Sequence, residues 1–294
     1  MKVLITGASG YVGRNLLNII DKNIYDVYAV VRKYNDDFPA NIKQILTDEN
    51  FEDNIQAASP HVVLHLAAFL TARSEKEDID KLIEANISFG SKLLNALKKT
   101  ELKYFINIGS FSEYHYNDGV LLPTYFYAAT KTAFRYILKY FSEVKKFNIL
   151  HIVPFSIYGG KDTQKKIMDI LFDALTANEP LKLSEGKQYL DFIHLNDVLD
   201  FFILLLKNLD KVKNDETLFL GTGKPHNLKE LAGIIADETG HLPKIQWGAL
   251  PPRERDTPYA VASISKLQET FNWQPQISLK QGVKLKSNEF FNRV

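Results

Sequence analysis

Short apolar segments alternate with longer amphipathic segments through the first half of the chain. The apolar segments are expected to be strands, and they cover 2–6, 25–32, 61–68, 103–110 and 148–155. Nearly all of their residues are apolar, which is typical of strands covered on both faces. Apolar residues at helical spacing predict helices over 11–21, 74–99 and 125–147. The alternation predicts an α/β fold, namely a Rossmann-type doubly wound parallel sheet.

The pattern changes after Tyr158. A hairpin is expected from 180–183 and 188–195, and Asn196 is expected to cap the helix that follows. A later helix has a candidate cap at Asn227. These elements predict a smaller C-terminal α/β lobe that carries no low-complexity linker. The predicted larger domain covers 1–159 and 192–222, and the predicted smaller lobe covers 160–191 and 223–294.

Composition narrows the class of protein. Apolar residues make up 45% of the 294 residues and charged residues 24%, as in an ordinary globular protein. A net charge of +1 gives no support to binding of nucleic acid or of an anionic membrane. The chain has no cysteine, which excludes disulfides and thiolate chemistry, and no metal site is expected. The N-terminus does not resemble a signal peptide, so a cytoplasmic protein is expected.

Three glycines, Gly7, Gly10 and Gly13, follow the first expected strand and lead into the first expected helix. A helix N-terminus offers unbonded N–H groups and a partial positive charge. Gly7 permits the tight turn, Gly10 lets the backbone approach a pyrophosphate, and Gly13 lets the helix pack close to the strand. The segment therefore predicts dinucleotide binding, and a glycine-rich turn without a ligand is the alternative.

The residues after the second expected strand, and after a possible further strand at 43–47, bear on the choice of dinucleotide. Arg32 stands where an NAD-binding strand usually ends in an acid, and a cation there suits the 2′-phosphate of NADP. Lys33 or Arg14 could assist it. The alternative is a solvated basic pair, and NAD is then the alternative cofactor. Asp48 is a candidate either for the adenine amino group or for a helix cap.

Tyr127 and Lys131 lie four residues apart on an expected helix and therefore share one face. A phenol is a poor acid at neutral pH because its ordinary pKa is about 10. We expect the Lys131 ammonium to lower the pKa of Tyr127, so that the phenol can exchange a proton with a carbonyl or an alcohol. Ser110, at the end of an expected strand, could bind the same substrate oxygen. A solvated surface helix is the alternative for such a pair.

Several segments resemble, in order, the extended branch of the short-chain dehydrogenase/reductase superfamily, the NAD-dependent epimerase/dehydratase family. TGASGYVG resembles the cofactor loop of the branch, and YAATK resembles its YxxxK motif. HLAA, GSFSEY, VPFSIYGG and the closing SISKLQETFNWQPQISLKQGV resemble further landmarks of the branch. The resemblance covers nearly the whole chain and implies an enzyme that acts on a nucleotide-diphosphate sugar.

The resemblance also implies a set of site residues. The implied catalytic residues are Ser110, Tyr127 and Lys131. The implied cofactor-binding residues are Gly7, Ser9, Gly10, Tyr11, Val12, Gly13, Arg32, Lys33, Asp48, Leu66, Ala67, Ala68, Asn86, Tyr127, Lys131 and Pro154. The implied substrate-binding residues are Ser112, Tyr158, Lys161, Lys187 and Arg253. For Lys161 and Lys187, a solvated surface charge is the alternative. The resemblance further implies a homodimer that pairs through 74–99 and 125–147.

Departures from the family pattern distinguish among the reactions that members of the family catalyse. The 4,6-dehydratases carry an acid–base pair where this chain has Phe111 and Ser112, and the epimerase–reductases that make fucose use a cysteine. The 4-epimerases hold NAD tightly and usually keep an acid at the position of Arg32. Leu190 replaces an arginine that often contacts the substrate phosphates. Carbonyl reduction needs only the serine, the tyrosine, the lysine and a 2′-phosphate site.

The sequence therefore predicts NADPH-dependent reduction of the keto group of a nucleotide-linked 4-keto-6-deoxy or 3,6-dideoxy sugar, with Tyr127 as the proton donor. FINIGSFSEY and LPTYFYAATK are similar to segments of the 4-ketoreductases that complete 3,6-dideoxyhexoses, the abequose and paratose synthases. That similarity implies a role in surface polysaccharide synthesis. Two alternatives stay open, a nucleotide-sugar 4-epimerase that retains NAD and a dinucleotide sensor without catalytic activity.

Overall fold

The computed structural model describes residues 1–162, 164–252 and 255–292. Its internal contacts divide the chain into two compact units. Unit 1 comprises Met1–Glu113, Tyr125–Val153 and Ile203–Leu218, and unit 2 comprises Tyr114–Thr124, Pro154–Phe202 and Phe219–Val294. These bounds differ from the domain bounds expected from the sequence, since unit 2 takes in 114–124, 154–159, 192–202 and 219–222.

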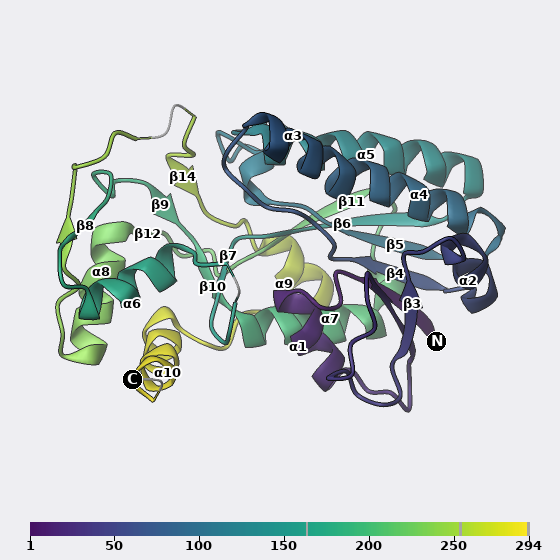
Figure 1. Cartoon of the computed structure of the whole chain (residues 1–294), viewed down its shortest axis with the longest axis horizontal. Coiled ribbons are helices and arrows are strands. Elements are labelled where there is room, and N and C mark those ends of the chain that lie inside the picture. Colours follow the sequence, from purple (N-terminus) through teal and green to yellow (C-terminus); the bar gives the residue numbers. More distant parts are fainter. Residues whose placement is uncertain (163, 253–254, 293–294) are drawn as a thin grey trace. The chain divides into compact units, whose positions relative to one another are not determined.

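The central element of unit 1 is a seven-stranded sheet, which confirms the expected doubly wound α/β fold (Figure 1). Its strands are β1 (Lys2–Thr6), β2 (Asp26–Val31), β3 (Lys43–Leu46), β4 (Val62–His65), β5 (Tyr104–Ile108), β6 (Asn148–Pro154) and β11 (Glu216–Leu220). They lie in the order β11-β6-β5-β4-β1-β2-β3, and the pairs from β3 through to β6 are parallel. The strand order reverses between β1 and β4, and ligands of such sheets bind beyond the carboxyl ends at this point.

Helices cover both faces of this sheet. On one side lies α1 (Tyr11–Ile19), and on the other lie α3 (Lys76–Ile83), α4 (Phe89–Ala96) and α5 (Phe126–Lys145) (Figure 1). The expected helix over 74–99 is confirmed as one helical run, in which a wide π-type turn at Glu84–Ser88 joins α3 to α4. Such turns inside α-helices frequently occur at functional sites.

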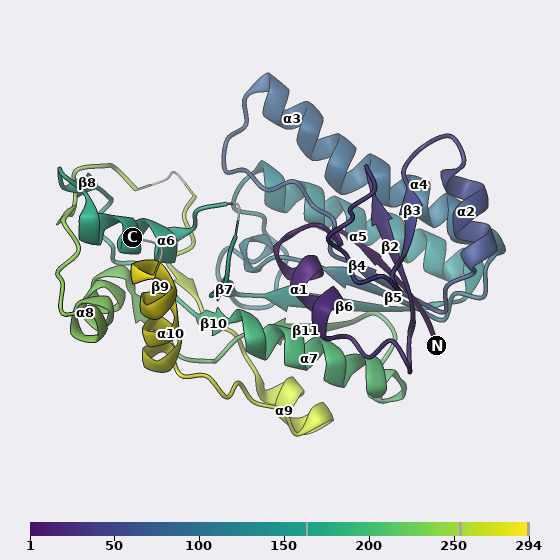
Figure 2. The same ribbon diagram turned by 60° about the horizontal axis from the view of Figure 1, so that its bottom comes forward.

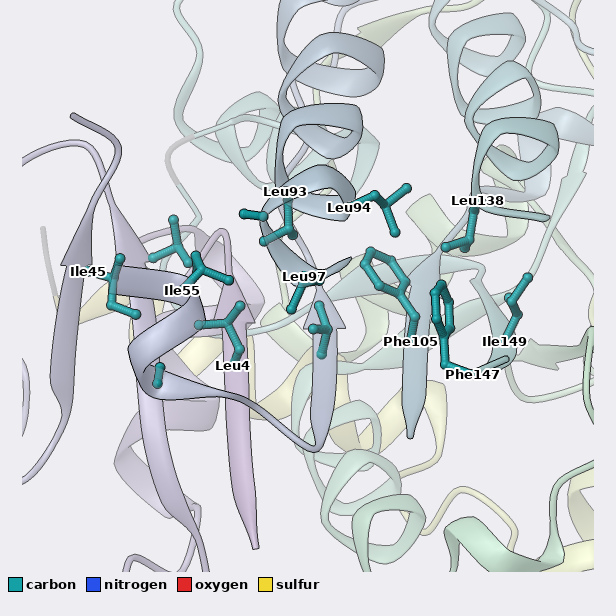
Figure 3. Close-up of a cluster of buried hydrophobic side chains, with 14 of the residues drawn as sticks. Leu4, Ile45, Ile55, Leu93, Leu94, Leu97, Phe105, Leu138, Phe147 and Ile149 are labelled. Carbon is teal, nitrogen blue, oxygen red and sulfur yellow. The ribbon is translucent and has the colours of Figure 1, made fainter. Parts of the chain in front are cut away.

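The core of unit 1 fills the space between the sheet and the helices that follow β3, β4 and β5 (Figure 3). Strand residues in it include Leu4, Val63, Phe105 and Ile149, and helix residues include Ile55 of α2 (Phe51–Ala58), Leu93, Leu94 and Leu138. Burying one such side chain fully stabilises the fold by about 1.5–3 kcal/mol. This packing fixes α5 against β5, and these two elements carry the candidate catalytic residues.

Unit 2 contains shorter strands and several helices (Figure 2). Its helices are α6 (Ile167–Thr176), α7 (Leu195–Lys207, which continues into unit 1), α8 (Leu228–Thr239), α9 (Ser265–Phe271) and α10 (Leu279–Phe291). Its strands are β7 (Ser156–Tyr158), β8 (Leu181–Lys182), β9 (Tyr189–Leu190), β10 (Phe192–His194), β12 (His226–Asn227), β13 (Ile245–Gln246) and β14 (Tyr259–Ala260). The expected cap of α8 is confirmed, because the Asn227 side chain accepts a hydrogen bond from the Glu230 N–H at 2.9 Å.

Two local expectations in unit 2 are wrong. The expected hairpin does not form, because β8 pairs with β13 while β9 pairs with β12 and β14. Strands of two residues carry no register signal of their own, so their partners are chosen by long-range packing. Asn196 does not cap α7, since that helix already begins at Leu195. Among the described residues, no helix has the length and hydrophobicity needed to cross a bilayer.

Candidate active site

The turn between β1 and the start of α1, residues 7–13, forms a cradle in which three positions are glycines. Gly7 has a φ of +65°, and a Cβ there would lie 2.7 Å from atoms of Leu66 and Ala67. Gly10 donates its N–H to the Gly7 carbonyl at 2.9 Å, and its own side of the turn is exposed. Within the described part of the chain, no side chain caps the N-terminus of α1. The cradle therefore fits a pyrophosphate, for which the helix provides N–H groups and a partial positive charge.

The other expected cofactor positions lie around this turn or at neighbouring strand ends. Arg32 and Lys33 are exposed directly after β2. Asp48 is exposed after β3, and its carboxylate accepts the Asn50 N–H at 3.0 Å. That bond stabilises the turn before α2 but is not a helix cap, because the N-cap position of α2 is Asn50 and no side-chain bond caps it in the described part of the chain. Pro154 ends β6 and belongs to unit 2.

A buried pair, Thr6 and His65, joins the ends of β1 and β4. The Thr6 hydroxyl lies 2.8 Å from His65 Nδ1 and accepts the Ala67 N–H at 3.2 Å. Burial, helped by the positive charge of Lys131, lowers the pKa of His65 to about 3, so the ring is neutral. The pair holds the loop after β4 in place against Gly7. Sequence reasoning missed it, although polar residues at the ends of two adjacent parallel strands were a usable signal.

The structure brings the expected catalytic side chains together within unit 1. Ser110 follows β5, while Tyr127 and Lys131 lie in the first turns of α5. The Ser110 side chain lies close enough to the Tyr127 phenol to lower the pKa of that phenol. Tyr127 and Lys131 are 7% and 2% exposed, so both polar groups sit in a largely desolvated environment. Their catalytic roles stay predictions, but the arrangement can hold an oxygen and give it a proton.

The protonation of this pair is governed by burial. Burial raises the pKa of Tyr127, and the nearby Tyr125 and Glu113 act in the same direction, while the Ser110 side chain opposes them. Burial also lowers the pKa of Lys131 to about 8. The expected lowering of the Tyr127 pKa is therefore wrong for the chain alone, because desolvation of the phenolate raises that pKa. A phenol that stays protonated at neutral pH is suited to donating a proton.

Asn86 fixes the part of α5 that carries the pair. It lies on the π-type turn between α3 and α4, and its side chain exchanges hydrogen bonds with the Phe69 backbone at 2.9 and 3.1 Å. The Asn86 amide also donates to the Thr130 hydroxyl at 3.0 Å, and that hydroxyl donates to the Tyr127 carbonyl at 2.7 Å. The asparagine thus contacts Thr130, the residue before Lys131.

The segment after Ser110 contains Ser112, an expected substrate-binding residue, and Glu113, to which sequence reasoning gave no role. The hydroxyl oxygens of Ser110 and the buried Ser112 lie 2.7 Å apart. Glu113 is fully buried, and Arg135 of α5 donates to its carboxylate at 2.7 Å. The signal for Arg135 was its spacing, because a residue eight positions after Tyr127 falls on the same helix face as Lys131.

Tyr158 is a core residue of unit 2. It is buried, its hydroxyl has no hydrogen-bond partner in the described part of the chain, and its ring meets the edge of His194 at 5.3 Å. A Cβ on Gly282 of α10 would overlap the hydroxyl, so that helix packs directly on it. These contacts give Tyr158 a packing role and do not favour a direct contact with substrate.

The remaining expected substrate-binding residues are charged side chains of unit 2. Lys187 is exposed and pairs with Glu185 at 2.5 Å, which favours the surface-charge alternative. Lys161 is also exposed. Arg253 lies outside the described residues.

The fold and the cradle define a dinucleotide-binding α/β protein, and comparison with known sequences gives its family. Residues 3–221 match the NAD dependent epimerase/dehydratase family, and the chain belongs to this family. A CDP-abequose synthase of Yersinia pseudotuberculosis is 28% identical over 240 residues, which cover 80% of this chain and 83% of that protein. A CDP-abequose synthase of Salmonella muenchen is 27% identical over 96% of both chains.

Solved structures with the same fold include sugar-nucleotide epimerases. The UDP-glucuronic acid 4-epimerase of Bacillus cereus, in complex with UDP-glucuronic acid and NAD, has a TM-score of 0.88 at 21% identity, with 100% of both chains covered. The UDP-glucose 4-epimerase of Thermus thermophilus, in complex with NAD, has a TM-score of 0.84 at 21% identity, again over 100% of both chains. At this level of identity the likeness shows the fold alone.

Proposed function

We propose that this protein reduces the keto group of a nucleotide-linked 4-keto-6-deoxy or 3,6-dideoxy sugar with NADPH. The observation that carries the proposal is the burial of Tyr127 and Lys131 on one face of α5, with the Ser110 side chain close enough to the phenol to lower its pKa. Membership of the family supports a nicotinamide dinucleotide at the β1–α1 turn. Similarity to two CDP-abequose synthases supports a nucleotide-sugar substrate and a role in polysaccharide synthesis.

In this proposal the chain's own residues handle the oxygen and the proton. A bound reduced dinucleotide supplies the hydride for the keto carbon. Tyr127 is protonated at neutral pH because burial raises its pKa, and it donates its hydroxyl proton to the substrate oxygen. Ser110 donates a hydrogen bond to the same oxygen, and Lys131 binds the ribose hydroxyls of the dinucleotide. One hydride and one proton convert the C=O bond to an alcohol.

Phe111 and Ser112 disfavour the dehydratase reaction of the family. Elimination of water needs an acid and a base after the catalytic serine or threonine, and this chain has Phe111 and Ser112 there. A 4-epimerase is the second candidate function, and the four-residue spacing of Tyr127 and Lys131 suits it equally well. It differs from a reductase in its cofactor, since it retains oxidised NAD and gives no net redox change.

The central experiment follows consumption of NADPH by the purified protein with a CDP-linked 4-keto-6-deoxy sugar. Reduced-nicotinamide absorbance is expected to fall as an alcohol product forms. Tyr127→Phe removes the proton donor and should lower kcat by about 10²–10⁴-fold without weakening dinucleotide binding. Tyr136→Phe, on the exposed face of the same helix, is the matched control. Stoichiometric NAD in the purified protein together with interconversion of UDP-hexoses would establish the epimerase instead, and unchanged turnover in Tyr127→Phe would favour the sensor.

The preference for NADPH rests on Arg32, assisted by Lys33, both exposed at the end of β2. Loss of one charged hydrogen bond to the 2′-phosphate costs about 1.5–3 kcal/mol, or roughly tenfold to a hundredfold in affinity. Arg32→Ala should show that loss with NADPH and none with NADH. Lys81→Ala, an exposed change on α3, should alter neither. If the wild-type protein used NADPH and NADH with equal catalytic efficiency, the role assigned to Arg32 would be wrong.

We also propose a homodimer through α3 and α5. Tyr136 and Tyr140, 67% and 65% exposed, lie one turn apart on α5, and Val144 continues the same face. Ile83 of α3 is also exposed, and α3 packs against α5. A row of large apolar side chains in water suits a second copy of the same face. Sedimentation velocity should show that the wild-type protein is a dimer and that Tyr140→Glu is a monomer. A monomeric wild-type protein would contradict this assignment.

A further inference from the structure

A buried ion pair links the loop after β5 to the helix that carries the catalytic pair. Glu113 is completely buried, and the side chain of Arg135 is 8% exposed. Arg135 Nε donates to Glu113 Oε2 at 2.7 Å, and its Nη2 donates to Oε1 at 3.3 Å. The Thr132 hydroxyl donates to Oε2 at 3.2 Å. The carboxylate is therefore tied to α5 by three donors.

The same carboxylate also holds the backbone of the expected catalytic serine. Oε1 of Glu113 accepts the Ser110 N–H at 2.8 Å. The neighbouring Gly109 makes this approach possible, because a Cβ there would lie 2.5 Å from that oxygen and 2.8 Å from Arg135 Nη2. The Ser110 backbone is thus fixed by a charge-assisted hydrogen bond, a stronger type than one between neutral groups.

These contacts connect the loop that carries Ser110 with the face of α5 that carries Tyr127 and Lys131. Tyr127, Lys131 and Arg135 repeat every four residues, so they occupy one face of α5. Ser110 reaches that face through Glu113, and its side chain also lies close enough to Tyr127 to lower the pKa of the phenol. In addition, the negative charge of Glu113 raises the pKa of both Tyr127 and Lys131. One carboxylate thus bonds both the serine loop and α5.

We infer that Glu113 is a positioning residue that sets the distance between the Ser110 hydroxyl and the Tyr127 phenol by clamping the serine loop onto Arg135. The inference rests on the proposed function, in which both hydroxyls bind one substrate oxygen. Glu113 touches no reacting atom, so it acts through Ser110. Misplacement of a catalytic group by about 1 Å can cost on the order of 10²-fold in rate.

Two changes at this pair separate positioning from simple structural support. In Glu113→Gln, the new amide must turn its NH₂ toward either Arg135 or the Ser110 N–H, so one of these bonds is lost. The double variant Glu113→Leu with Arg135→Met removes both charges, and apolar replacements of buried ion pairs are often neutral or stabilising. Asp169→Asn is the matched control, because its partner Lys286 is also nearly buried and lies 2.6 Å away, in unit 2.

The measurements are kcat, KM, the dinucleotide Kd and the free energy of unfolding for each variant. Glu113→Gln should lower kcat by about 10²-fold, whereas KM and Kd change by less than about threefold. The double variant should regain stability while kcat stays low, because the Ser110 N–H still lacks its acceptor. Asp169→Asn should lose stability at unchanged kcat. A double variant with wild-type stability and wild-type kcat would overturn the inference, since it would leave the pair a structural role only.

Amide hydrogen exchange gives a second readout that needs no substrate. The Ser110 N–H should exchange about tenfold faster or more in the double variant Glu113→Leu with Arg135→Met, which removes its acceptor, with protection in β4 and α4 unchanged. Unchanged protection at Ser110 would overturn the inference whatever the kinetics show. If the unchanged protein reduces no keto sugar, the proposed function fails, and the exchange rate still decides whether Glu113 holds the serine loop.

Discussion

Replacement of Gly13 by alanine tests the packing behind the dinucleotide cradle. Gly13 is buried in α1, and a Cβ there would lie 2.3 Å from the Gly7 carbonyl oxygen and 2.8 Å from Ala8 Cα. Both are backbone atoms, so no side-chain rotation can relieve the overlap. The helix must move away from β1 by roughly 1 Å, and overpacking of this kind typically costs about 1–3 kcal/mol.

Two other glycines provide matched comparisons. A Cβ on Gly10 would meet only the Gly7 carbonyl, at 3.1 Å, so Gly10→Ala should leave the fold nearly unchanged. The same Cβ would occupy the exposed side of the turn that we assign to the pyrophosphate. Gly233 lies on the exposed side of α8, and a Cβ added there would have no described atom within 4 Å, so Gly233→Ala should stabilise the protein by about 1 kcal/mol.

Urea unfolding and titration with NADPH distinguish the three variants. Gly13→Ala should lose both stability and dinucleotide affinity. Gly10→Ala should bind the dinucleotide at least tenfold more weakly at nearly constant stability, which corresponds to a loss of about 1.4 kcal/mol of binding free energy. Gly233→Ala should gain stability alone. Wild-type affinity in Gly10→Ala would refute the assignment of the pyrophosphate to this turn. Wild-type stability in Gly13→Ala would refute the argument from close packing.

Three further predictions concern buried polar groups. Asp191 is fully buried and accepts hydrogen bonds from the N–H groups of Thr222, Gly223 and Ala262 and from the Thr222 hydroxyl, so Asp191→Asn should cost about 3 kcal/mol of unfolding free energy in urea. Burial lowers the pKa of Lys131 from 10.5 to about 8, which at about 1.4 kcal/mol per unit corresponds to about 3 kcal/mol. Lys131→Met should therefore stabilise the chain by up to that amount while abolishing turnover, and a destabilised variant would contradict this. Burial also lowers the pKa of His65 and His151 from 6.5 to about 3. The unfolded chain binds protons there first, so each ring should cost about 2 kcal/mol of stability as the pH falls from 6.5 to 5, and NMR signals of a charged ring above pH 5 in the folded protein would contradict it.

The local sequence determined the glycine turn, five of the seven strands of the central sheet and the shared face of Tyr127 and Lys131. Each of these follows from a short-range rule. Glycine alone adopts the backbone of Gly7 without strain, buried parallel strands must be apolar, and residues four apart on a helix are neighbours. The capping of α8 by Asn227 was likewise readable, because a cap and its partner are three residues apart.

Only the tertiary structure decided features that join distant parts of the chain. Glu113 meets Arg135 across 22 positions, and β8 finds β13 rather than its neighbour in sequence. The pKa of Tyr127 depends on how much water the fold removes around the phenol, and the packing of Tyr158 depends on a glycine far along the chain. Desolvation and long-range pairing are properties of the whole packed chain, so no local pattern of residues encodes them.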